Sequence, residues 1–171
     1  MASRIGMSAF MAVLFLMSPL IGHAAGVLPR PTGEVVLSVT GSIRNTNAPG
    51  SAEFDVAMLE NIGKTTLRTS TAWTAGPAVF EGVLARDLLK AVGADGENVE
   101  ATALNDYVVS IPMADVTQYD VMLALKMDGE YLKVRDKGPI WIVYPRDQHS
   151  ELQDPKTDKK WIWQLCNIRV N

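Results

Sequence analysis

Cysteine and histidine are scarce in this sequence. Cys166 is the one cysteine among 171 residues, so no disulfide can form within the chain and stability must come from packing. The two histidines are His23 and His149, and no serine lies in a Gly-x-Ser-x-Gly segment. A hydrolase needs a nucleophile activated by a neighbouring base, so the sequence predicts no catalytic residue of this kind. So few thiols and imidazoles also argue against a zinc or copper site, and we expect no metal ligand in the chain.

Phosphate-binding glycine loops and an excess of positive charge are absent too. The sequence contains neither Gly-x-Gly-x-x-Gly nor a Walker segment, which argues against a nucleotide held by such a loop. The formal net charge is −3, with 16 Lys and Arg against 19 Asp and Glu. Binding to nucleic acid depends mainly on positive charge that neutralises phosphates, so nucleic acid is not an expected partner.

A long apolar run is missing except at the N-terminus, and even there it is short. Arg4 precedes apolar residues from Met7 to Met17, and Pro19 is followed by small residues up to Ala24. This arrangement is typical of a cleavable secretory signal peptide over residues 1–24, with an uncleaved anchor as the alternative. No later segment approaches the roughly 20 apolar residues of a membrane helix. We therefore expect residues 25–171 to form one soluble domain without membrane insertion, located in the periplasm of a Gram-negative bacterium.

Short alternating or β-branched runs dominate the rest of the chain. They predict strands over residues 34–40, 65–71, 79–83, 99–104, 107–113, 121–127, 140–144 and 161–170. Helical spacing predicts one helix from Ser51 to Gly63 and another over 84–92, and the charged stretch 146–160 is expected to be a loop. Asn105-Asp106 and Asp128-Gly129 favour hairpin turns. Many strands with two inserted helices predict an α+β fold.

Tryptophan is plentiful for a domain of this size, and planar rings beside polar groups suit a flat heterocyclic ligand. Trp73 and Trp161 stand at the edges of polar stretches and are the better ligand candidates. Trp141 lies inside an apolar run and is expected in the core. Core packing is the alternative for each tryptophan taken singly. His149 is expected to be a solvated loop residue and Cys166 a small apolar residue on a strand.

Five segments in the same order resemble the molybdopterin-binding domain of sulfite oxidases and periplasmic methionine sulfoxide reductases. Phe-Glu-Gly-Val-Leu-Ala-Arg-Asp-Leu-Leu, residues 80–89, resembles the family segment Trp-x-Gly-Val-x-Leu-x-Asp-Leu-Leu. Residues 103–113 resemble the Asp-Gly-Tyr hairpin of the family. Residues 122–132 and 138–145 resemble its paired segments Leu-Ala-x-x-x-Asn-Gly-x-x-Leu and Gly-Pro-x-Arg-Leu-Val-x-Pro. Residues 160–165 resemble its final segment, Lys-Trp-x-x-x-Ile. The resemblance implies a sulfite-oxidase-type molybdopterin-binding fold with mixed sheets and a few short helices.

The sequence departs from the family pattern at the position of the metal ligand. Catalytic members of the family carry a molybdenum-binding cysteine a few residues before a tryptophan, and the matching run here is Arg-Thr-Ser-Thr-Ala-Trp, residues 68–73. A hydroxyl does not replace a thiolate as a soft ligand. The resemblance therefore implies a pterin or molybdopterin-like ligand without a metal. The ligand-binding residues that it suggests are Trp73, Asn105, Asp106, Tyr144, Trp161 and Trp163.

Three functions are consistent with these observations. The first is a non-enzymatic periplasmic pterin-binding protein that signals its ligand state to an inner-membrane receptor, a synthase or phosphodiesterase of cyclic di-GMP, as in similar periplasmic regulators. The second is a molybdenum-cofactor-dependent oxidoreductase of sulfite oxidase type with an unusual metal ligand. The third is a structural or chaperone protein with a vestigial pocket. The missing cysteine favours the first.

Overall fold

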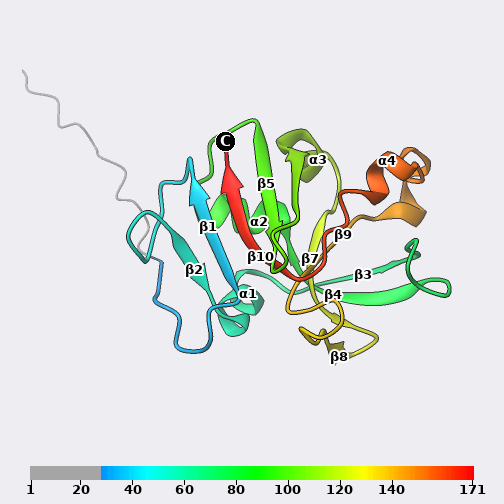
Figure 1. Ribbon diagram of the computed structural model, residues 1–171, viewed down its shortest axis with the longest axis horizontal. Helices are drawn as coiled ribbons and strands as arrows, with labels where there is room; N and C mark the ends of the chain where they lie inside the picture. Colours follow the sequence, from blue (N-terminus) through cyan, green and yellow to red (C-terminus); the bar gives the residue numbers. More distant parts are fainter. Residues whose placement is uncertain (1–27) are drawn as a thin grey trace, which may run out of the picture.

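The computed structural model describes residues 28–171, which form two five-stranded sheets with short helices around them (Figure 1). The expected signal peptide, residues 1–24, and the first residues after it lie outside the described part of the chain. The first sheet has the strand order β2-β1-β10-β5-β6. Its strands are β1 (Leu37–Gly41), β2 (Ala52–Phe54), β5 (Asn98–Ala103), β6 (Val108–Pro112) and β10 (Leu165–Val170).

The last strand, β10, occupies the centre of this first sheet. It runs parallel to β1 on one side and antiparallel to β5 on the other (Figure 1). Residues 38–41 pair with residues 167–170, so the beginning and the end of the described chain are joined through backbone hydrogen bonds. This closure carries the segment that precedes β10 into the middle of the molecule.

The second sheet has the order β3-β4-β7-β8, with β9 also paired to β7. Its strands are β3 (Thr65–Thr69), β4 (Ala78–Leu84), β7 (Met122–Met127), β8 (Glu130–Tyr131) and β9 (Trp141–Val143). Gly82 stands where the pairing of β4 with β7 shifts register, and a Cβ atom there would collide with the carbonyl oxygen of Leu123. Only glycine permits this close approach of two backbones.

Four α-helices and two 3₁₀-helices connect the strands. They are α1 (Val56–Ile62), α2 (Ala85–Ala91), α3 (Met113–Gln118), η1 (Arg146–Gln148), η2 (Ser150–Leu152) and α4 (Pro155–Asp158). Gly93 follows α2 with φ of +62°, the left-handed conformation in which glycine commonly ends a helix. The N–H groups of Met58 and Lys156 donate to the carboxylates of Asp55 and Asp154, which cap α1 and α4.

The α+β class and the mixed sheets are confirmed, whereas several sequence-predicted boundaries are wrong. The predicted helix from Ser51 begins only at Val56, because residues 52–54 pair with β1 as strand β2. The stretch 146–160 contains three short helices and is not an extended loop. Residues 161–164 precede β10, so Trp161 and Trp163 do not share the face of a strand as predicted. Helix α3 follows β6 directly and was not predicted.

The core is continuous from one sheet to the other. It includes large side chains that are fully enclosed: Phe54, Leu59, Phe80, Leu88, Ile111, Leu123, Ile140, Trp141 and Tyr144. Trp141 is 0 % exposed, so its predicted place in the core is confirmed. Buried side chains of this size contribute about 1.5–3 kcal/mol each to folding, which accounts for a stable domain without a disulfide.

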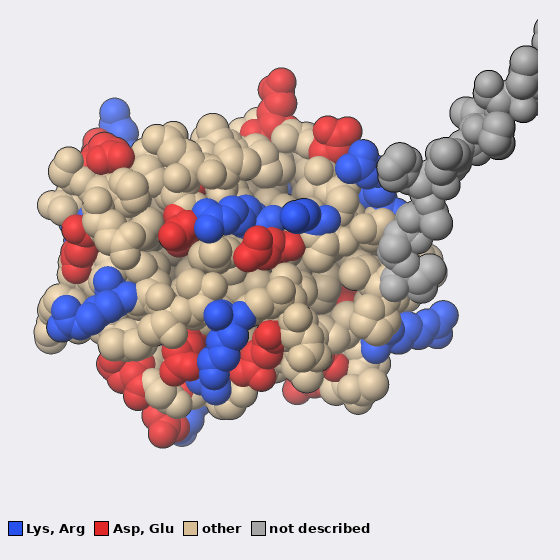
Figure 2. All heavy atoms as spheres, turned by 180° about the vertical axis from the view of Figure 1, so that it is seen from behind, with Lys and Arg blue, Asp and Glu red and all other residues tan. Residues whose placement is uncertain are grey.

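The surface carries both signs of charge. Figure 2 shows acidic and basic side chains interspersed over the face seen from behind, without a large region of one sign. Such a surface gives no long-range attraction for a polyanion. Within residues 28–171, no helix has both the length and the apolar character that crossing a membrane requires.

Asp55 gives the stability of the fold a specific pH dependence. Its buried carboxylate accepts hydrogen bonds from the N–H groups of Gly33, Met58 and Thr32, and these bonds hold its pKa below the ordinary value of 3.8. The stabilisation is therefore complete above about pH 5 and is lost as the pH falls through the lowered pKa. We expect Asp55→Asn to flatten the acid limb of the unfolding free energy, measured by urea titration from pH 2 to pH 6. Asp136→Asn, at an exposed carboxylate, should leave that limb unchanged.

Candidate functional site

Four indole rings form one cluster between the two sheets. The ring of Trp73, from the turn between β3 and β4, lies 6.2 Å from that of Trp141, 6.1 Å from that of Trp161 and 5.3 Å from that of Trp163, measured between ring centroids. Most of these pairs meet edge to face, the arrangement that aromatic quadrupoles favour. Trp73 is 39 % exposed, whereas Trp141 and Trp161 are buried. Trp73 is thus the outer ring of the cluster.

A cavity of about 290 Å³ opens beside this cluster. Its wall is mostly apolar and has a few polar groups, the composition usual for sites that hold small organic molecules. The volume is at the lower end of the range of about 300–1,000 Å³ for such sites, so the cavity suits a ligand of one or two fused rings. The lining residues are Trp73, Ala103, Asn105, Tyr107, Asp158, Lys159, Trp161, Ile162 and Trp163.

Four of the six predicted ligand-binding residues meet at this cavity. Trp73, Asn105, Trp161 and Trp163 line it, although they come from three separate parts of the chain. Asp106 is exposed in the turn between β5 and β6, with φ of +64°, and is not part of the lining.

Tyr144 lies behind the cavity. Its ring centroid is 6.1 Å from that of Trp161, and its hydroxyl donates to Oδ2 of Asp115 at 3.1 Å. Lys160 Nζ donates to the same oxygen at 2.6 Å. Burial, together with the charge of Asp115, raises the pKa of the Tyr144 hydroxyl well above its ordinary range. Tyr144 therefore packs near Trp161 without being part of the lining.

Asp158 and Lys159 line the cavity, although they were not predicted from the sequence as ligand-binding residues. Both belong to the stretch 146–160, whose high charge predicted a solvated loop. Asp154-Pro155 is a recognisable helix start, because aspartate caps and proline suits the first turn, and this signal marks α4. Helix α4 lies on the side of the molecule where β3 and β4 meet in their turn (Figure 1). Its last residue, Asp158, is part of the cavity lining.

Two buried polar atoms of the lining residues lack hydrogen-bond partners within residues 28–171. They are the indole Nε1 of Trp161, a donor, and Oδ1 of Asp158, an acceptor. A buried polar group without a partner costs about 1–3 kcal/mol. Both atoms are enclosed by the surrounding protein, so they belong to the wall behind the surface of the cavity.

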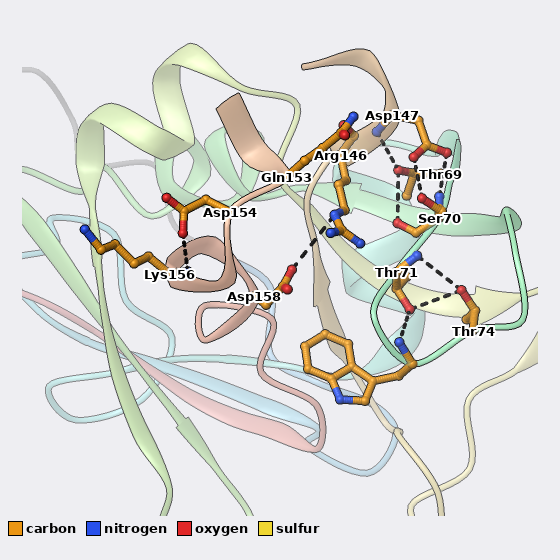
Figure 3. A network of polar contacts seen from close by, with 11 residues as sticks. Thr69, Ser70, Thr71, Thr74, Arg146, Asp147, Gln153, Asp154, Lys156 and Asp158 are labelled. Atoms are coloured by element: carbon orange, nitrogen blue, oxygen red, sulfur yellow. Dashed lines mark hydrogen bonds and ion pairs between the residues drawn. The ribbon is translucent and has the colours of Figure 1, made fainter. Parts of the chain in front are cut away.

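The hydroxyl-rich stretch before Trp73 is tied to η1 (Figure 3). The N–H and the hydroxyl of Ser70 both donate to the carboxylate of Asp147, and the N–H of Asp147 donates to Oγ1 of Thr69 at 3.2 Å. Oγ1 of Thr71 accepts from the N–H of Trp73 and is hydrogen-bonded to Oγ1 of Thr74. All three hydroxyls of residues 69–71 are therefore engaged within the protein.

These residues do not fit a molybdenum centre of the kind that the family resemblance implies. The side chains at 69–71 are neutral oxygen donors already engaged in hydrogen bonds, whereas that centre needs a thiolate. No group of three or more His, Cys, Asp or Glu side chains in the described part of the chain is arranged to hold a metal ion. The aromatic cavity, by contrast, fits the flat pterin portion of the cofactor.

Cys166 lies on β10 and not in the stretch 68–73. Its thiol donates to the carbonyl oxygen of Thr102 at 3.4 Å, on the neighbouring strand β5. Burial, and to a smaller extent the charge of Asp106, raises the pKa of this thiol. A raised pKa keeps the sulfur protonated, which disfavours a role as nucleophile or metal ligand.

The fold and the cavity define a class: a small α+β domain with one mixed and one antiparallel sheet and a cavity lined by aromatic side chains. Comparison with known families agrees, because the family described as oxidoreductase molybdopterin binding domain matches residues 53–148. The chain belongs to this family and carries a molybdopterin-binding domain of oxidoreductase type. No protein of curated function matches the sequence significantly.

Among solved structures, the crystal structure of the sulfane dehydrogenase SoxCD from Paracoccus pantotrophus is similar, with a TM-score of 0.60 and 19 % sequence identity. The similarity covers 85 % of this chain and 40 % of the SoxCD chain. The chain thus spans well under half of the length of that protein. At this level of identity the likeness confirms the sulfite-oxidase-type fold.

The contact between Asp147 and Ser70 should control the mobility of residues 69–71. We expect Asp147→Ala to increase the exchange rate of the Ser70 amide hydrogen about tenfold, because that amide loses its acceptor. Hydrogen exchange measured by NMR tests this. Asp120→Ala, which removes an exposed ion pair with Arg86, is the matched control and should leave the Ser70 amide unaffected. Equal exchange in both variants would contradict the assigned role of Asp147.

Proposed function

We propose that the protein binds a pterin without transforming it. The observation that carries this proposal is the cavity, which three indole-bearing residues line together with the polar residues Asn105 and Asp158. A pterin is planar and has both acceptors and donors on its edges, so it suits this combination of surfaces. The molybdopterin-binding family to which the chain belongs is consistent with a pterin-like ligand.

The engaged hydroxyls at residues 69–71 support binding without oxidation. A molybdenum-dependent oxidoreductase would need a metal ligand that this stretch does not supply, since its side chains are oxygen donors bonded to Asp147 and Thr74. The family name includes oxidoreductases, so this activity is the competing hypothesis. Stoichiometric molybdenum in the protein purified from cells grown with molybdate would establish the oxidoreductase and contradict our proposal.

We further propose that the domain acts in the periplasm and signals its ligand state to an inner-membrane synthase or phosphodiesterase of cyclic di-GMP. The N-terminal residues with signal-peptide character and the missing metal ligand support this role. It predicts that chemical crosslinking will join the domain to the periplasmic part of such an enzyme, encoded by a neighbouring gene, to a different extent with and without pterin. Equal crosslinking in both conditions would contradict a signalling role.

Export predicts a defined N-terminus. We expect the protein expressed in a Gram-negative host with a C-terminal tag to appear in the periplasmic fraction and to begin at Ala25, because a signal peptidase cleaves after small residues. Intact-mass spectrometry of the tagged protein measures this. A variant with Val13 and Leu14 replaced by arginine should remain in the cytoplasm at full length. A full-length mass in the periplasmic fraction of the unaltered protein would contradict cleavage.

Trp73 should carry much of the ligand affinity. It is the partly exposed ring of the cavity, and stacking of an aromatic side chain on a heterocyclic base contributes about 1–3 kcal/mol. We therefore expect Trp73→Ala to weaken binding of 7,8-dihydropterin and pterin by about 5- to 150-fold in isothermal titration calorimetry, and Trp73→Phe to retain part of the affinity.

The control for this experiment is Tyr131→Ala. Tyr131 is an exposed aromatic residue on β8 that does not line the cavity, so its loss should leave ligand affinity unchanged. Absence of any heat or tryptophan-fluorescence change with either pterin in the unaltered protein would overturn the proposed function.

A further inference from the structure

Asp158 is the one acidic residue among those that line the cavity, and the local backbone geometry holds it there. It ends α4, whose first turn is capped by Asp154 and begins with Pro155. The carbonyl oxygen of Asp158 accepts from the N–H of Trp161 at 3.2 Å. This turn brings the carboxylate of residue 158 and the indole of residue 161 to the wall of one cavity.

The carboxylate of Asp158 has a countercharge but lacks a short hydrogen bond. Its Oδ1 atom lies 4.0 Å from Nε of Arg146, too far for a hydrogen bond, and both atoms are buried without a partner within residues 28–171. Figure 3 shows the two side chains pointing toward each other. Arg146 balances the negative charge beside Oδ1, and this oxygen is enclosed and closed to the cavity. The other oxygen, Oδ2, is not among the enclosed atoms and has no hydrogen-bond partner within residues 28–171, so it is the oxygen that can accept from a ligand.

The accepting capacity of Oδ2 matches a particular chemical group. An ionised carboxylate oxygen accepts N–H donors, and such charge-assisted hydrogen bonds are stronger than neutral ones. The 2-amino group of a pterin is such a donor at the edge of the ring. Lumazine, the 2-oxo analogue of pterin, has a carbonyl oxygen in place of the amino group and would set oxygen against oxygen.

Building on the proposed function, we propose that Oδ2 of Asp158 determines ligand specificity by accepting a hydrogen bond from the 2-amino group, so that the site selects 2-aminopyrimidine heterocycles over their 2-oxo analogues. The resemblance suggested Asn105 and Asp106 as polar ligand-binding residues. Asp106 is exposed outside the lining and Asn105 is an exposed residue of the lining, whereas the Asp158 side chain is only 20 % exposed and faces Arg146.

The experiment compares pterin and lumazine by isothermal titration calorimetry on the mature protein. A site that pairs with a substrate N–H group rejects an analogue lacking it, so we expect the unaltered protein to bind pterin at least about tenfold more tightly than lumazine. Asp158→Asn offers one donor and one acceptor and should lower the pterin affinity at least about tenfold, which removes most of the discrimination. Asp106→Asn is the matched control and should preserve both.

The outcomes separate this inference from the proposed function. Binding of pterin and lumazine with equal affinity by the unaltered protein, or discrimination retained in Asp158→Asn, would overturn the role of Asp158 and leave pterin binding intact. Binding of neither compound would overturn both. Circular dichroism establishes whether Asp158→Asn is folded, and if it is not, the pterin-to-lumazine ratio of the unaltered protein decides.

Discussion

The contact of the Trp73 ring with three other indole rings holds the candidate site together. These rings come from the turn between β3 and β4, from β9 and from the segment before β10, and their centroids lie within 5.3–6.2 Å of that of Trp73. Aromatic pairs of this geometry are worth about 0.5–1.5 kcal/mol each beyond the burial of their surface. The cluster thus contributes to the stability of the fold and at the same time forms one wall of the cavity.

The polar contacts around this cluster are the physical basis of the proposal that the protein binds its ligand without transforming it. Residues 69–71 occupy the stretch where the resemblance implies a metal-binding thiol, and their hydroxyls are bonded to Asp147 and Thr74. The cavity that remains beside them is aromatic and carries one buried carboxylate. Such a site favours recognition of a heterocycle, since it supplies stacking surface and an acceptor, and it offers no soft ligand for a metal.

Much of the local structure follows from short-range signals. The sequence predicted the turns at Asn105-Asp106 and Asp128-Gly129, the helix that ends before Gly93 and the core position of Trp141. These features were predictable because turn preferences, helical spacing and apolar runs act over a few residues. The start of the helix after Ser51 was not, since residues 52–54 form a strand only through pairing with β1. Strand pairing also decides the state of residues 161–164. Their alternating pattern predicted a strand, but these residues do not pair in the sheet and lie before β10.

The sequence by itself determined the α+β class and the family, and it shows that residues 68–73 contain no thiol. It also identified Trp73 and Trp161 as residues to be sought in a cavity. Tertiary structure alone decided which polar groups surround them: it joined Ser70 to Asp147, 77 residues away, and set Asp158 beside Trp73 in one cavity. Contacts of this kind depend on the pairing of β10 with β1 and β5. The spacing of residues along the chain does not predict that pairing. Backbone preferences are local, whereas the chemistry of a cavity is the product of segments that meet only after the chain has folded.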